Sequence, residues 1–185
     1  MTSYADFYRR SIDDRDAFWA EQAQLIDWQT PPQTICDYSK PPFAKWFVGG
    51  TTNLCHNAVD RHLKDRADQP ALIAVSSEVP GADGRPGERI YTFAELHAEV
   101  QAMAAILQSL GVQKGEPVAL FMNNCPQYVV AHYAIQKIGA IVCPCGPLNK
   151  AHELQYQLDD LKARAIIAAD NLLPIVEQVR GQTAL

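Results

Sequence analysis

Gly49-Gly-Thr-Thr52 has a composition suited to holding a phosphate, because glycines let backbone N–H groups approach an anion and hydroxyls can bind its metal. The context favours another interpretation. No Gly-Lys-Ser/Thr follows, no strand clearly precedes the glycines, and the helix predicted after them opens with Asn53. Thr52 or Asn53 is therefore interpreted as a helix N-cap, and we expect no phosphate site in this stretch.

The histidines do not have the spacing of metal ligands. There are five, at His56, His62, His97, His132 and His152. His56 and His62 fall on different faces of a helix, and no Glu-x-x-His motif joins them. We expect each histidine to be a surface group or a half-buried group with its own partner. Cys55 and His56 are neighbours whose side chains diverge on a helix, and no Gly-x-Ser-x-Gly is present, so hydrolase chemistry is unsupported.

The cysteines and the paired aspartates also favour structural interpretations. Five cysteines, at Cys36, Cys55, Cys125, Cys143 and Cys145, form an odd set without the spacing of a disulfide framework, which predicts reduced thiols. Cys143-Pro-Cys145 lacks the two-residue spacer of redox and zinc motifs and lies in an apolar run typical of a buried strand. Asp159 and Asp160 would point about 100° apart on a helix, which indicates a solvated face. The residues therefore predict no catalytic, cofactor-binding or metal-binding side chain.

Length and charge exclude several classes of protein. The chain has 185 residues, 48% of them hydrophobic and 20% charged, which is enough to bury a sizeable core. A formal net charge of −5 provides no general attraction to nucleic acid or anionic lipid. No apolar segment follows the arginines at positions 9 and 10, and no run of apolar residues is long enough to cross a bilayer. We expect a soluble, cytoplasmic protein that does not bind nucleic acid.

In the first half of the chain, the sequence pattern changes from helical to proline-rich and then back to helical. Residues 4–26 have helical spacing, with Ser11 as a possible N-cap. Residues 27–50 carry prolines between aromatics, which predicts an extended strap lying over another surface rather than a regular element. Residues 54–66 return to a helical pattern that Pro70 ends. Strands are predicted at residues 71–75 and 89–92, joined as a hairpin by a long loop, residues 80–87.

From Thr92 onward, apolar strands alternate with amphipathic helices. Thr92 and Glu95 form a capping box, and Gly111 stands where a left-handed residue would end the helix. The predicted elements are a helix at 92–110, a strand at 117–122, a helix at 126–138, a strand at 140–143, a helix at 152–161, a strand at 165–168 and a helix at 172–179. This order predicts an α/β fold with a mostly parallel sheet, right-handed crossovers and helices on both faces.

Several segments in the N-terminal part resemble the opening of short-chain acyl-CoA synthetases, closest to propionyl- and acetyl-CoA synthetase. They are Tyr4-Ala-Asp-Phe-Tyr-Arg-Arg-Ser, Phe18-Trp-Ala-Glu-Gln-Ala, Ile26-Asp-Trp28, Pro42-Phe-Ala-Lys-Trp-Phe47 and Thr52-Asn-Leu-Cys-His-Asn-Ala-Val-Asp-Arg-His62. The later part is similar to the first core motifs of AMP-forming acyl-CoA ligases, with a lean toward medium- and long-chain fatty-acid members. Its matching segments are Tyr91-Thr-Phe-Ala-Glu-Leu96, Leu110-Gly-Val-Gln-Lys-Gly-Glu-Pro-Val118, Asn123-Asn-Cys-Pro-Gln-Tyr128 and Ile138-Gly-Ala-Ile-Val142, followed by Asn149.

The resemblance covers the whole chain but only about the first third of such an enzyme. It implies a parent ligase that converts a carboxylic acid, ATP and coenzyme A to acyl-CoA, AMP and diphosphate through an acyl-adenylate, with Mg²⁺ offsetting phosphate charge. The family's phosphate loop, adenine-binding motif, ribose-binding aspartate and adenylating lysine have no counterpart here. Asp170-Asn-Leu-Leu-Pro-Ile175 stands where acetyl-type synthetases carry a Gly-x-Arg-x-Gly-Arg stretch that helps bind coenzyme A. No site residue is therefore transferred to this chain.

Two hypotheses remain open from the sequence. In the first, the chain is an inactive N-terminal piece of the ligase, with residues 1–52 as helix and strap and residues 53–185 as an incomplete α/β subdomain. Its partner would be the rest of the same chain, and the acid's length is undecided. The sequence ends straight after a βα unit, which fits a piece of something larger. In the second, it is a self-sufficient, non-catalytic α/β binding or interaction module.

Overall fold

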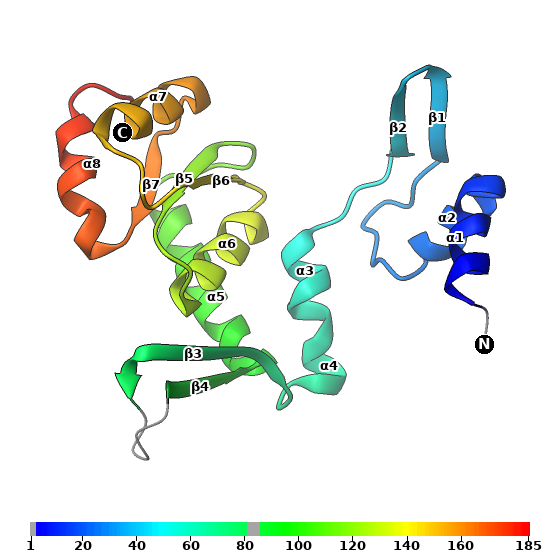
Figure 1. Cartoon of the computed structure of the whole chain (residues 1–185), viewed down its shortest axis with the longest axis horizontal. Coiled ribbons are helices and arrows are strands. Elements are labelled where there is room, and N and C mark those ends of the chain that lie inside the picture. The colour runs from blue at the N-terminus through cyan, green and yellow to red at the C-terminus, as the bar shows by residue number, and fades with distance from the viewer. Residues whose placement is uncertain (1–2, 81–85) are drawn as a thin grey trace. The chain divides into compact units, whose positions relative to one another are not determined.

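A computed structural model describes residues 3–80 and 86–185, and it separates into two compact units, one ending at Asn57 and the other running from Ala58 to Leu185. The first unit contains α1 (Tyr4–Asp13), α2 (Arg15–Ala23), β1 (Thr34–Lys40), β2 (Phe43–Val48) and most of α3 (Leu54–Ala58) (Figure 1). The domain boundary predicted between residues 52 and 53 stays a prediction.

Helix formation near the N-terminus differs from the expectation. The single helix predicted at 4–26 is wrong, because the chain breaks at Asp14 between α1 and α2. The prediction of Ser11 as an N-cap is also wrong. Ser3 caps α1, because its hydroxyl oxygen accepts a hydrogen bond from the Asp6 N–H. The Ser11 hydroxyl instead donates to the carbonyl of Tyr8 inside α1. Ser11 therefore satisfies a helix carbonyl instead of starting a helix.

The strap predicted at 27–50 is in part a regular element. β1 and β2 pair antiparallel, with Cys36 opposite Trp46, and the turn between them holds the Pro41-Pro42 pair. The prediction of a strap without regular structure is therefore wrong for residues 34–48. The prolines are compatible with the two strands because none of them occupies a paired position, so no ladder N–H is lost.

The second unit begins with short helical pieces and a β-ribbon. Its first elements are η1 (Asp60–His62), α4 (Leu63–Arg66), β3 (Pro70–Pro80), β4 (Pro86–Thr92) and α5 (Phe93–Ser109). The continuous helix predicted at 54–66 is wrong, because buried Val59 has non-helical dihedral angles and separates α3 from η1. β3 and β4 form the predicted antiparallel hairpin, although its strands are longer than expected. The predicted long loop lies partly outside the described residues.

The rest of the second unit is a parallel α/β layer. Its elements are β5 (Pro117–Phe121), α6 (Pro126–Lys137), β6 (Ile141–Cys145), α7 (Ala151–Leu161), β7 (Ala165–Ala168), η2 (Asp170–Leu172) and α8 (Leu173–Arg180). The strand order is β6-β5-β7, and both pairings are parallel, which confirms the predicted α/β class. The capping box of Thr92 and Glu95 is present, and Gly111 has a φ of +88°, so both predicted ends of α5 are confirmed.

The sheet is covered on both faces. On one face, Ala119 and Phe121 of β5 pack with Leu154, Leu158, Val176 and Val179 of α7 and α8. On the other face, Leu120 packs against Ala131 of α6 together with Met122. Figure 1 shows α7 and α8 on one side of the sheet and α6 on the other. This arrangement follows from parallel strands joined by right-handed crossovers in opposite directions.

Candidate functional site

The Gly49–Thr52 stretch is a packing junction of the first unit. The N–H groups of Gly50 and Thr51 already donate to the carbonyls of Phe47 and Thr30, so they are not available to cradle a phosphate. A Cβ on Gly50 would lie 2.8 Å from the Trp28 ring. The side-chain oxygen of Asn53 accepts the N–H of His56, which confirms Asn53 as the N-cap of α3.

A cavity of about 320 Å³ lies at the carboxyl ends of β5 and β6 and is called here the strand-end cavity. It is lined by Met122, Asn123, Asn124, Tyr128, Pro144, Cys145, Gly146 and Pro147. This is the end of a parallel sheet at which α/β proteins bind ligands. The strand order reverses at β5, since the chain passes to β6 on one side and then to β7 on the other.

The lining of the strand-end cavity is polar but uncharged. Its hydrogen-bonding groups are the amides of Asn123 and Asn124, the Tyr128 hydroxyl and the backbone at Gly146. Among the residues that the structure describes, no lysine, arginine, aspartate or glutamate lines it, so the lining does not fit a triphosphate or a Mg²⁺ ion. Its cysteine is also a poor nucleophile, because burial and the neighbouring Cys143 raise the pKa of the Cys145 thiol.

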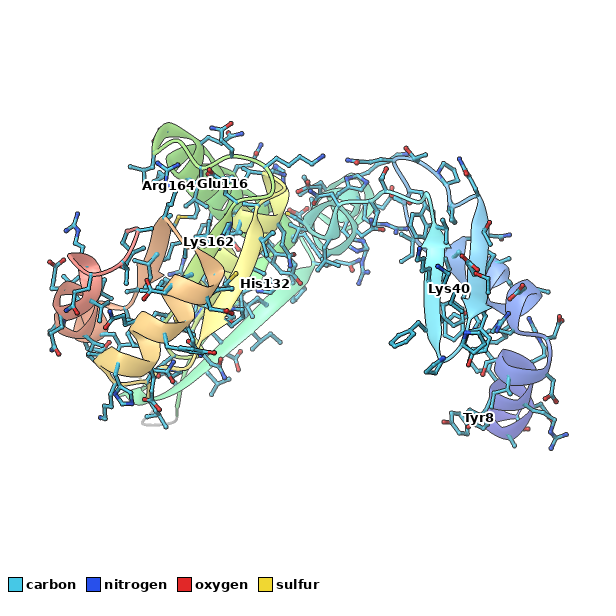
Figure 2. The ribbon with its side chains drawn as sticks, turned by 90° about the horizontal axis from the view of Figure 1, so that it is seen from above. Tyr8, Lys40, Glu116, His132, Lys162 and Arg164 are labelled. Carbon is cyan, nitrogen blue, oxygen red and sulfur yellow. The ribbon has the colours of Figure 1, made fainter. Side chains whose placement is uncertain are left out.

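Tyr128, which lines the cavity, contacts His132 one helical turn further along α6. His132 is labelled in Figure 2. The two rings stack with centroids 6.2 Å apart, and Tyr133 meets the same imidazole edge-on at 5.6 Å. Burial lowers the pKa of His132, so the ring is neutral at neutral pH. Among the described residues, the buried His132 Nδ1 has no hydrogen-bond partner. This pair was not predicted from the sequence, although an aromatic and a histidine four residues apart on a helix are a recognisable signal.

A charged cluster lies elsewhere in the second unit. Asp60 in η1 accepts hydrogen bonds from Lys137 Nζ at 2.7 Å and from His97 Nδ1 at 2.9 Å, which ties η1 to α6 and α5. Burial alone would raise the pKa of Asp60, but the bonds from Lys137 and His97 outweigh it and lower that pKa. An aspartate held ionised in this way is a structural anchor and a weak base. The contacts span 37 and 77 residues, so no local pattern could have predicted them.

The structure also places the remaining cysteine, aspartate and histidine candidates of the sequence analysis. Cys143 and Cys145 are buried free thiols on β6, and Asp159 and Asp160 are exposed on α7, as predicted. His56 Nε2 lies 3.3 Å from Asp27 Oδ2, and the His152 side chain is exposed. Within residues 3–80 and 86–185, no three His, Cys, Asp or Glu side chains gather as metal ligands would.

Two family models match consecutive parts of the chain. The model described as the acetyl-coenzyme A synthetase N-terminus matches residues 4–58, and the model described as AMP-binding enzyme matches residues 59–184. The chain belongs to the AMP-binding enzyme family. This confirms the predicted resemblance.

Relatives of this AMP-binding enzyme chain agree in both sequence and fold. It is 45% identical over 168 residues to the propionate–CoA ligase of Salmonella typhimurium, covering 91% of this chain and 26% of that protein. It is 40% identical over 167 residues to the acetyl-coenzyme A synthetase of Streptomyces avermitilis, covering 90% and 24%. Acetoacetyl-CoA synthetase from Streptomyces lividans matches the whole structure with a TM-score of 0.81 and 27% identity, over 29% of that chain.

The chain thus spans about a quarter of the length of the curated relatives it matches. Across the part of the chain that the structure describes, no helix is long and apolar enough to span a bilayer.

Proposed function

We propose that this chain forms the N-terminal segment and the first α/β subdomain of an AMP-forming ligase that activates a short-chain carboxylic acid. The observation that carries the proposal is the consecutive match of the two family models, which together account for residues 4–184. The similar propionate–CoA ligase and acetyl-coenzyme A synthetases support acetate or propionate as the substrate. The lean toward longer fatty acids in the sequence analysis has no support among these relatives.

The proposed reaction joins a carboxylate to AMP with release of diphosphate, after which coenzyme A displaces AMP. ATP, coenzyme A and Mg²⁺ would be the ligands of the longer enzyme. The uncharged strand-end cavity cannot neutralise phosphates, so the cationic and metal-binding groups would come from outside this chain. This chain's role is architectural, and the cavity contributes a neutral wall on the ligand-binding side of the sheet.

Complementation tests the proposal directly. The chain would be co-expressed with the remaining part of the Salmonella typhimurium propionate–CoA ligase, and diphosphate release would be measured with acetate, propionate, butyrate and palmitate. We expect turnover only when both polypeptides are present, with acetate or propionate as the best acid. Leu154→Asp, which buries a charge in the α7 core, should abolish it, whereas Asp159→Asn on the exposed face of α7 should not.

Failure to complement with a folded chain would contradict the ligase proposal. Turnover by the chain alone would contradict the architectural role. Tight binding of a small ligand by the chain alone, without complementation, would favour the non-catalytic module.

The cavity wall has its own test in the complemented enzyme. Tyr128→Ala should lower kcat/KM by about tenfold, equivalent to about 1.4 kcal/mol, because it removes the ring that lines the strand-end cavity. Tyr156→Ala is the matched control, since that ring is 73% exposed on α7 and does not line the cavity. Equal effects of the two substitutions would remove the cavity from the proposed site.

A further inference from the structure

Three side chains of α6 stand one above another beside the strand-end cavity. Tyr128, His132 and Gln136 are four residues apart, so they share one face of the helix. The Tyr128 and His132 rings are nearly parallel, at 22°, with centroids 6.2 Å apart. One turn further along, the Nε2 atoms of Gln136 and His132 are 3.1 Å apart. The imidazole therefore has an aromatic ring on one side along the helix and an amide on the other.

Contacts within α6 define the plane of the His132 ring. Tyr133 meets the imidazole at 90°, with centroids 5.6 Å apart, while Tyr128 lies nearly parallel to it. The torsion that turns an imidazole has a broad energy profile, so neighbouring groups decide the plane of the ring. Because burial lowers the pKa of His132, the ring is neutral at neutral pH and stacks on tyrosine as an uncharged aromatic ring.

Tyr128 is oriented by packing and not by a hydrogen bond of its side chain. Across residues 3–80 and 86–185, the Tyr128 hydroxyl has no hydrogen-bond partner. The ring packs against the core formed by Leu120, Met122 and Ala131, and it stacks on His132. These ring contacts determine how Tyr128 lines the strand-end cavity.

His132 lies behind the wall of the strand-end cavity and does not line it. Any effect of this residue on a ligand in the cavity must pass through a residue that lines it, and the stacking contact with Tyr128 provides that connection. If His132 only filled space, another apolar side chain could replace it. If it orients Tyr128, position 132 requires a flat ring, because stacking needs two planar faces.

We propose that His132 is a positioning residue for the ligand-binding side of the sheet, where its ring stacks on Tyr128 and keeps that side chain in the wall of the strand-end cavity. This inference rests on the proposed function, because it takes the cavity to belong to the ligand-binding side of a ligase. His132 does not touch the ligand. The property required at position 132 is a planar face and not an ionisable group.

Two substitutions separate orientation from space filling. His132→Phe keeps a planar ring, whereas His132→Leu keeps an apolar side chain without a planar face. Both remove the polar contact with Gln136, so the loss of that contact is matched between them. His152→Leu makes the same replacement at an exposed histidine of α7 and is the control.

The environment of the Tyr128 ring is the first readout. The chain would carry ring-¹³C tyrosine, and the Tyr128 resonance would be assigned by its absence from Tyr128→Phe. We expect His132→Leu to move this resonance toward that of an exposed tyrosine, because a stacked ring shifts the resonances of its neighbour. His132→Phe should keep it away from that position, and Tyr156, exposed on α7, should be unchanged in both variants. A Tyr128 resonance at the same position in both variants would overturn the proposal.

Kinetics of the complemented enzyme are the second readout. Tyr128→Ala is expected to lower kcat/KM by about tenfold, and His132→Leu should reproduce most of that loss. His132→Phe should remain within about twofold of wild type, since residues that act through a contact recover when the contact is restored. Adding His132→Leu to Tyr128→Ala should cause no further loss, because the two residues act as a unit. His152→Leu should match wild type.

A further loss of about tenfold in the double variant would overturn the proposal, since His132 would then act independently of Tyr128. Complementation with equally active Phe and Leu variants would also overturn it and leave the ligase function standing. A Tyr128 resonance that distinguishes the two variants, without complementation, would leave the positioning role standing and remove the ligase function. If His132→Leu fails to fold, judged by circular dichroism, His132→Met takes its place, because that flexible side chain also lacks a planar face.

Discussion

The interior of each unit is packed by a different kind of side chain. In the first unit, ring contacts run from Phe7 through Phe18 and Trp19 to Trp46, with centroid distances of 4.8, 5.2 and 5.7 Å. In the second unit, the sheet is packed by aliphatic side chains of three helices, and Val118, Ala119, Leu120 and Phe121 of β5 are fully buried. Loss of one ring contact is therefore a local event in the first unit, whereas a change in β5 affects both faces of a sheet.

A spectroscopic difference makes this comparison measurable. All three tryptophans, Trp19, Trp28 and Trp46, lie in the first unit, so their fluorescence reports its unfolding. Far-UV circular dichroism is dominated by the helices and strands of the second unit, which holds most of the chain. Urea unfolding followed by both signals should separate effects on the two units.

The largest effect is expected for Phe121→Ala. The side chain is fully buried in the α7 and α8 core, so its truncation leaves a cavity and should lower the free energy of unfolding by about 3–5 kcal/mol. The circular dichroism transition should move to lower urea, and the tryptophan transition should move less. Equal shifts of both transitions would show that the two units unfold as one.

Gly50→Ala should give the opposite pattern at smaller magnitude. The added methyl group would lie 2.8 Å from the Trp28 ring and 3.0 Å from the Phe47 carbonyl, so the first unit must shift, at a cost of about 1–3 kcal/mol. The tryptophan transition should move first. Gly181→Ala is the matched control, because a Cβ there meets nothing within 4 Å. If neither substitution shifts the tryptophan transition, the packing of the first unit does not depend on a glycine beside Trp28.

Asp60→Asn should lower the free energy of unfolding of the second unit by about 1–2 kcal/mol at pH 7. It removes the negative charge and replaces with an amide donor one of the two carboxylate oxygens that accept from Lys137 and His97. Because the pKa of Asp60 is lowered in the folded state, its stabilisation is present above the ordinary aspartate pKa and is lost as pH falls through the folded value. The difference between wild type and variant should therefore shrink toward zero under strongly acidic conditions.

The measurement is circular dichroism in urea at pH 7 and near pH 3. Asp159→Asn, on the exposed face of α7, is the control and should match wild type at both pH values. A difference for Asp60→Asn that grows on acidification would contradict the assigned direction of the pKa shift.

The smallest effect, and the only stabilising one, is expected for Lys162→Gly. Lys162 ends α7 in a left-handed conformation with a φ of 55°, which a glycine adopts without a steric penalty (Figure 2). The substitution should raise the free energy of unfolding by up to about 1 kcal/mol. The circular dichroism transition should shift to higher urea while tryptophan fluorescence stays unchanged. Destabilisation would mean that the lysine side chain has a role beyond ending the helix.

Local sequence signals predicted much of the second unit. Thr92 and Glu95 satisfy each other's backbone within a single turn, Gly111 supplies a positive φ, and alternating apolar runs mark β5, β6 and β7. The burial of Cys143 and Cys145 and the helix cap at Asn53 were also predicted, because they depend on neighbours in sequence. Prolines misled the prediction for β1 and β2, since their positions outside the paired residues depend on the register.

What the sequence determined by itself is the set of elements whose causes lie within a few residues: caps, helix ends and the apolar period that gives the α/β class. Only the tertiary structure decided the strand order, the strand-end cavity and the Asp60 cluster, because each depends on groups brought together across tens of residues.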